Sequence, residues 1–141
     1  MRSSVLRGSF AAFLLVACAQ GPQDAAGGLA GTSWQLVKFQ GGDGAVLRAD
    51  DKSKYTLTFN ADNTLEARID CNRGRGGWKS AGPSQLELSP MAVTRAMCPP
   101  GSIDFEILKR LPHVRSYLFK DGHLFLSMMA DGGTFEFEPV R

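Results

Sequence analysis

The sequence predicts a mainly β domain: a small antiparallel barrel, or a strongly rolled sheet, of about seven or eight strands with one α-helix. Three observations support this prediction. Apolar residues alternate with polar ones at a period of two through most of the chain after residue 30. Short turn sequences such as NADN and KDGH separate these runs. One segment, residues 102–111, has helical spacing instead, and its helix would cover an open end or face of the sheet.

The predicted strands follow from the alternating runs. In chain order these are WQLVKF (34–39), YTLTF (55–59), TLEARI (64–69), QLELS (85–89), SYLF (116–119), LFLSM (124–128) and TFEFE (134–138). In the first run, a strict period of two puts Phe39 on the face opposite to Trp34 and Leu36. In the last run, Phe135 and Phe137 are expected to point inward. The NADN turn at 60–63 makes a hairpin of the second and third runs.

The predicted helix spans SIDFEILKRL, residues 102–111. Its apolar residues fall on one helical face; they are Ile103, Ile107, Leu108 and Leu111. Ser102 is expected to be the N-cap, and Pro112 is expected to stop the helix. The acidic residues lie in the first turn and the basic ones in the last, as the helix dipole favours.

The N-terminal residues predict export and a lipid anchor. Arg2 and Arg7 precede an apolar run, residues 10–17, that is too short to span a bilayer of about 30 Å. The run ends in LVAC, which resembles the lipobox of bacterial lipoproteins, so residues 1–17 are expected to be a signal peptide and Cys18 the lipidated N-terminus. Residues 18–29 are expected to form a flexible tether to a single domain over residues 30–141.

The charge balance excludes a basic nucleic-acid-binding protein. The chain has 16 basic and 14 acidic residues, and removing Arg2 and Arg7 leaves 14 of each. The mature domain is therefore close to neutral, without the excess of positive charge that binding to nucleic acid requires.

Cys71 and Cys98 are the two cysteines that remain if Cys18 carries lipid. An oxidising compartment favours their pairing, and closing a loop of this length would stabilise the domain by roughly 3–4 kcal/mol in the loop-entropy model. The chain lacks the C-x-x-C of redox pairs, and His113 and His123 form no spaced zinc-ligand set with the cysteines. The pattern favours a structural disulfide over free thiols, a metal site or catalysis.

Known catalytic motifs do not occur: there is no G-x-S-x-G, no H-E-x-x-H and no carboxylate pair flanked by aromatic residues. We therefore expect no catalytic residues, no metal site and no cofactor. The glycine-rich stretch NRGRGG, residues 72–77, is interpreted as a turn between two strands. Phe125, Met128 and Met129 are interpreted as residues of the inner face.

Two cysteine motifs resemble those of the META/HslJ-like domain, whose members pair C-N-x-x-x-G-x-[aromatic] with a later T-R-x-x-C. The matching residues are Cys71, Asn72, Gly76 and Trp78, followed by MAVTRAMC at 91–98. The opening LAGTSWQLV, the hairpin YTLTFNADNTLEA and the ending LFLSMMADGGTFEF are also similar, so the likeness covers residues 29–138. One departure is Asp70, where relatives often have glycine.

The resemblance implies a barrel-like β fold with one helix, often in a bacterial envelope lipoprotein. Some members are associated with heat shock or novobiocin resistance, and a protozoan relative with virulence; no enzyme activity is established for the family. Carried over by position, the recurring polar residues are Asn72, Arg73, Thr94 and Arg95. These residues would form either a structural hydrogen-bond network or a binding surface.

Together these features predict a non-enzymatic, monomeric lipoprotein at the outer membrane, facing the periplasm. Ala19, rather than aspartate, after Cys18 resembles the outer-membrane sorting pattern. The domain would bind an unidentified envelope protein and support integrity under stress. The alternative is a carrier of a small apolar ligand, with Phe125, Met128 and Met129 lining a cavity in the barrel.

Overall fold

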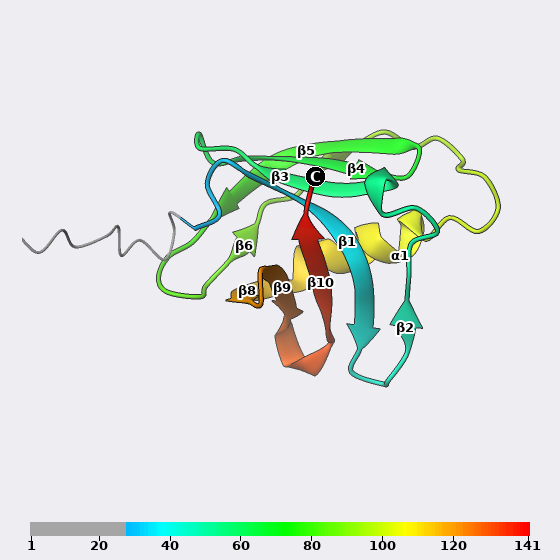
Figure 1. The fold of residues 1–141 in the computed structure, drawn as a ribbon. Coiled ribbons are helices and arrows are strands. Elements are labelled where there is room, and N and C mark those ends of the chain that lie inside the picture. Colours follow the sequence, from blue (N-terminus) through cyan, green and yellow to red (C-terminus); the bar gives the residue numbers. More distant parts are fainter. Residues whose placement is uncertain (1–27) are drawn as a thin grey trace, which may run out of the picture.

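A computed structural model describes residues 28–141, which form a mainly β, nearly closed barrel-shaped antiparallel sheet with a single α-helix (Figure 1). The predicted signal peptide, Cys18 and most of the predicted tether lie outside the described residues. The strands are β1 (Thr32–Gly41), β2 (Val46–Leu47), β3 (Tyr55–Phe59), β4 (Thr64–Ile69), β5 (Asn72–Lys79), β6 (Glu87–Leu88), β7 (Ala92–Val93), β8 (Val114–Lys120), β9 (His123–Met128) and β10 (Gly133–Pro139).

Eight strands form the main sheet in the order β6-β5-β4-β3-β1-β10-β9-β8. The short β2 pairs with β1, and the short β7 pairs with β5. The two ends of this order meet at a seam, where Leu86 N–H donates to the Arg115 carbonyl at 3.0 Å and Tyr117 N–H donates to the Ser84 carbonyl at 2.9 Å. The predicted fold class is therefore confirmed, and the seam removes most of the exposed edge that a flat sheet would leave.

The core fills the inside of the barrel with the inward residues of the alternating strands. Its fully buried large side chains include Tyr55, Phe39, Phe59, Phe135, Leu36, Leu57 and Leu65. The alternation predicted Phe135 and Phe137 correctly, and both are buried. Trp78 packs edge-on against Phe59, with ring centroids 5.6 Å apart.

The prediction for β1 was wrong at Phe39. The register between β1 and β10 shifts between Leu36 and Lys38, which is an irregularity of the kind a β-bulge produces. One extra residue at this point returns Phe39 to the face that Trp34 and Leu36 occupy, and all three side chains are buried. Phe39 then packs against Phe135, with ring centroids 4.7 Å apart.

The interpretation of NRGRGG as a turn was also wrong. Residues 72–77 lie in β5, which pairs with β4 from Ile69↔Asn72 to Thr64↔Gly77. The turn is the preceding pair Asp70-Cys71, where Asp70 has a φ of +56°. The glycines instead permit a close approach: a Cβ on Gly76 would lie 2.8 Å from Met91 Cγ, because the segment between β6 and β7 runs alongside the strand there.

Helix α1 (Asp104–Arg110) continues into a 3₁₀ turn, Leu111–His113, so the helix is shorter than predicted. Ile103, not Ser102, is the N-cap residue, although the Ser102 hydroxyl accepts a hydrogen bond from Asp104 N–H at 3.2 Å. The apolar face is as predicted, with Ile107 and Leu111 buried. Both residues border the barrel interior beside Leu36 and Phe137, so α1 covers this part of the core.

Candidate binding groove beside the disulfide

A groove with a volume of about 410 Å³ separates α1 from the segment 88–96. Its apolar lining comes from Leu88, Met91, Val93, Phe105, Leu108 and Leu111. Arg95 and Lys109 bring positive charge to the same groove, and Asn72 and Asp104 lie in its wall. The groove thus combines an apolar lining with two cationic side chains and one carboxylate, which is the composition of a site for an amphipathic partner.

A disulfide between Cys71 and Cys98 fixes one side of this groove. The Cα atoms of the two residues are 5.5 Å apart, within the usual range for a disulfide. The bond joins the Asp70-Cys71 turn to the segment that precedes α1. The sequence left a disulfide, free thiols, a metal site and a catalytic role open for this pair, and the structure shows the disulfide.

Asn72 makes the second connection between the same elements. Its side chain is 2% exposed, and its Nδ2 donates to the Ala96 carbonyl at 3.1 Å and to Asp104 Oδ2 at 3.2 Å. Its Oδ1 accepts from Ala96 N–H at 2.8 Å and from the Thr94 hydroxyl at 3.0 Å. One buried amide therefore joins β5, the 94–96 segment and the start of α1, and its polar atoms are satisfied by protein groups.

The four polar residues carried over from the family divide into two groups. Asn72 and Thr94 belong to the structural network, where the Thr94 hydroxyl also accepts from Arg73 N–H at 2.9 Å. Arg95 is exposed and lines the groove. The Arg73 side chain lines a different hollow, on the outer face of β3, β4 and β5.

Two apolar residues near the groove are unusually exposed. Phe105 on α1 is 70% exposed and lines the groove, and Met97, which precedes Cys98, is 98% exposed. Lys109 Nζ lies 5.3 Å from the centroid of the Phe105 ring, at cation–π distance. Sequence reasoning missed Phe105, although its place outside the apolar stripe of the helix was a usable signal.

Glu106 organises the polar side of α1. Hydrogen bonds from Lys109, at 2.9 Å, and from Arg110 lower the pKa of Glu106 below its ordinary value. Arg110 in turn lies over the Phe39 ring, 4.9 Å from its centroid. These contacts hold the Lys109 side chain on the helix surface beside Phe105.

The three residues expected to line an internal cavity do not share one. Phe125 and Met128 border a hollow on the outer face of β1, β9 and β10, and Met129 is 47% exposed. The interior space beside α1, between Leu36, Leu57 and Phe137, has no room for a water molecule. Large aromatic and aliphatic side chains fill the barrel, as in other small barrels.

Two further features concern the described part of the chain alone. No three His, Cys, Asp or Glu side chains within residues 28–141 gather as a metal site would need. Within the same residues, α1 and the 3₁₀ turns are too short to cross a bilayer.

Comparisons with known proteins agree on the fold. The family model described as the META domain matches residues 27–140. A protein from Burkholderia xenovorans, solved by NMR, has a TM-score of 0.67 at 20% identity, covering 99% of both chains. A DUF4847 family protein from Bacteroides vulgatus has a TM-score of 0.58 at 18% identity, covering 78% of this chain and 93% of that one. A search of curated proteins found no match.

Proposed function

Because the chain belongs to the META domain family, we propose that it is a non-enzymatic envelope lipoprotein whose domain binds a partner protein in the groove between α1 and segment 88–96. Such a module would protect the envelope under stress by holding its partner near the membrane. The exposure of Phe105 beside the apolar groove is the observation on which this proposal rests.

The chemistry of the groove defines the partner. Leu108, Met91 and Val93 offer an apolar lining, and the exposed Phe105 ring offers an anchor of the kind that dominates protein interfaces. Arg95 and Lys109 would attract acidic residues next to the bound apolar segment. The expected partner is therefore an envelope protein that presents an apolar segment flanked by aspartate or glutamate.

The membrane anchor would keep the domain close to its site of action. If Cys18 carries lipid, the ten residue-to-residue steps from Cys18 to Gly28 reach at most about 36 Å. Replacing Cys18 with serine should release the protein from the membrane fraction, and intact protein should carry the extra mass of its acyl chains. Recovery of the unaltered protein in the soluble fraction would contradict the lipoprotein proposal.

The groove is tested by photocrosslinking in intact cells. A photoreactive phenylalanine at position 105 should give a discrete protein adduct, and the matched probe at Val46, an exposed apolar residue on β2, should not. Arg95→Glu combined with Lys109→Glu should abolish the adduct, because the partner segment is expected to be acidic.

Three results would contradict the groove as the binding site. They are identical adducts from positions 105 and 46, no adduct from either, or an adduct that survives reversal of both charges. An adduct with the mass of a lipid at position 105 would instead favour the carrier function. Peptide mapping of the adduct must place the crosslink on an apolar segment with acidic neighbours.

A further inference from the structure

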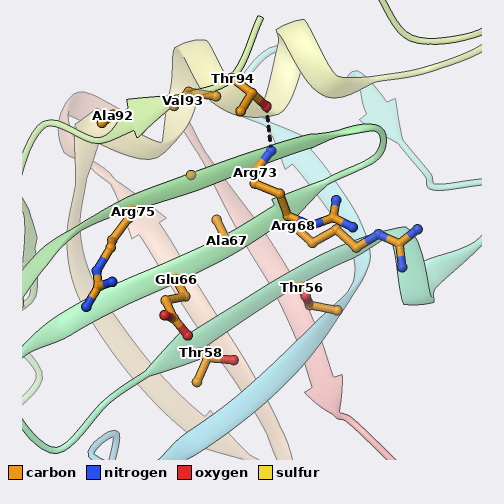
Figure 2. Close-up of a pocket in the computed structure, with 11 residues that line it drawn as sticks. Thr56, Thr58, Glu66, Ala67, Arg68, Arg73, Arg75, Ala92, Val93 and Thr94 are labelled. Carbon is orange, nitrogen blue, oxygen red and sulfur yellow. Dashed lines mark hydrogen bonds between the residues drawn. The ribbon is translucent and has the colours of Figure 1, made fainter. Parts of the chain in front are cut away.

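Two arginines that do not line the groove stand side by side on the outer face of the sheet, on β4 and β5. In the antiparallel register Thr56 of β3 pairs with Arg68 of β4, and Arg68 pairs with Arg73 of β5. The three side chains form one cross-strand row and line a hollow of about 660 Å³ (Figure 2). Neighbours in such a row lie about 5 Å apart at Cβ, so the two arginines are direct neighbours.

Both guanidinium groups are held by one carbonyl oxygen. Arg68 Nε donates to the Asp70 carbonyl at 3.4 Å, and Arg73 Nη1 donates to the same oxygen at 3.4 Å and to the Asn72 carbonyl at 3.2 Å. The two donor nitrogens are thus at most about 7 Å apart, since each lies 3.4 Å from a shared atom. The turn at Asp70 orients the pair, and Figure 2 shows both side chains reaching along the sheet towards that end of the β4–β5 hairpin. Each guanidinium has further N–H donors besides those used in these bonds.

These two positive charges lack a carboxylate partner within 4 Å among residues 28–141. Some cations of the domain do have one, such as Lys38 with Glu136, Lys52 with Glu138 and Arg110 with Glu106, whereas Arg75 and Arg115 also lack one. Like charges directly opposite each other destabilise a sheet, so a row with two adjacent arginines carries a cost that an anion would offset.

Three acidic side chains lie on or near the arginine row, and one of them, Glu66, also lines the hollow. In the next row, Glu66 faces Arg75, which balances that row. Along the arginine row, Glu138 lies three strands from Arg68, beyond Thr56 and Gln35. Hydrogen bonds from Gln35 and then Lys52 lower the pKa of Glu138. Hydrogen bonds from Ser53, with smaller contributions from the charges of Lys54 and Arg68, lower the pKa of Asp51. Three arginines and one glutamate line the hollow, so its lining carries a net positive charge.

We propose that the Arg68–Arg73 pair, with the Thr56 hydroxyl, forms an anion-binding site for a phosphate group. A planar guanidinium group can donate two parallel hydrogen bonds to two phosphate oxygens. Two such groups bonded to the same carbonyl oxygen can donate to one phosphate from two directions. The open hollow admits a phosphate on a larger molecule as readily as the free ion. The hollow shares Val93 and Thr94 with the groove, but neither arginine lines the groove, so the proposal stands whether or not the groove binds a protein.

The test follows the arginine side-chain Nε–H resonances by NMR in the ¹⁵N-labelled full chain, purified in a non-ionic detergent. Inorganic phosphate is titrated at constant ionic strength, and short-chain phosphatidylglycerol is titrated separately, with phosphatidylcholine as its control. The Arg68 and Arg73 signals should shift in a saturable way. The Arg115 signal should not, although Arg115 also donates to backbone carbonyls, those of Pro112 and Val114.

Three variants distinguish a specific anion-binding site from non-specific attraction between charges. Arg68→Gln with Arg73→Gln should weaken binding by at least about 10-fold, and the matched Arg115→Gln should leave it unchanged. Glu66→Gln should strengthen binding by about 2-fold, because it removes the acidic side chain that lines the hollow. This third variant keeps the test decisive if the double variant does not fold.

Each result has a defined meaning. A response to phosphate as well as to phosphatidylglycerol assigns the site to soluble phosphates, and a response to phosphatidylglycerol alone assigns it to a lipid headgroup. Equal shifts at Arg115, binding retained by the double variant, no gain from Glu66→Gln, or no shift at all would overturn the proposal.

Discussion

The two tyrosines of the chain occupy contrasting buried sites. Tyr55 Oη accepts a hydrogen bond from Ile103 N–H at 3.1 Å and lies 3.3 Å from the Ser102 hydroxyl. Tyr117 Oη is buried and has no hydrogen-bond partner among residues 28–141. A buried hydroxyl without a partner loses its contact with water and gains nothing in return.

Replacing each tyrosine with phenylalanine should therefore have opposite effects. Tyr55→Phe should lower the free energy of unfolding by about 1–2 kcal/mol, because Ile103 N–H loses its acceptor. Tyr117→Phe should leave this free energy unchanged or raise it by about 1 kcal/mol. Urea unfolding measures both values, and an equal loss in the two variants would show that the Tyr117 hydroxyl has a partner.

Ala130 stores backbone strain in the turn between β9 and β10. Its φ is +52°, a left-handed conformation that costs a residue with a Cβ about 1–2 kcal/mol. Ala130→Gly should raise the free energy of unfolding by about 0.5–1 kcal/mol, since the relief exceeds the added entropy of the unfolded chain. In Ala61→Gly, a turn position outside the left-handed region, thermal unfolding should show no gain.

At the scale of elements, the short turn Asp70-Cys71 organises both candidate sites. Its carbonyl at Asp70 holds the two arginines, and Cys71 begins the crosslink to the groove wall. Asp70 itself has a positive φ, a conformation that glycine would adopt without strain. Asn72 then fixes the segment after β7 against β5.

Two residues of this region should separate structure from binding. Asn72→Ala should lower the free energy of unfolding by about 2–3 kcal/mol, because Ala96 N–H and the Thr94 hydroxyl lose a buried acceptor. Arg95→Ala, at an exposed position of the same segment, should change it by less than about 0.5 kcal/mol. Equal losses in denaturant unfolding would mean that Arg95 also belongs to the structural network.

The alternation of apolar residues predicted the strands whose packing is regular. It failed where contacts between segments distant in the sequence decide the structure. Leu57 and Phe59 alternate cleanly and are buried as predicted. Phe39 was placed on the wrong face because a register shift is invisible to a strict period of two. The glycines of β5 resembled a turn because only the folded chain brings Met91 close to Gly76. The Arg68–Arg73 pair likewise requires the strand register, which the sequence does not reveal.

At the scale of the whole molecule, the barrel is held together by few hydrogen bonds at its seam. At the seam, the 84–86 segment meets β8 through the Gln85↔Ser116 bridge and the two hydrogen bonds of Leu86 and Tyr117. By contrast, β1 and β10 pair along most of their length, from Trp34↔Pro139 to Gly41↔Gly133. Local opening should therefore begin at the seam rather than at the centre of the sheet.

Hydrogen exchange measures this difference directly. The amide protons of Leu86 and Tyr117 should exchange faster than those of Leu36 and Phe137, because fewer hydrogen bonds must break to expose them. Equal protection of the two sets would mean that the barrel opens only by global unfolding.

The position of β1 has a mechanical consequence. The N-terminal segment continues directly into β1, which is hydrogen-bonded to β3 on one side and to β10 on the other. A pull along this strand would load both ladders in shear, so their hydrogen bonds would resist together instead of breaking one by one as at a peeled edge. Tension from the N-terminal side therefore acts on a strand that is paired on both sides, while the seam between the 84–86 segment and β8 lies elsewhere in the sheet.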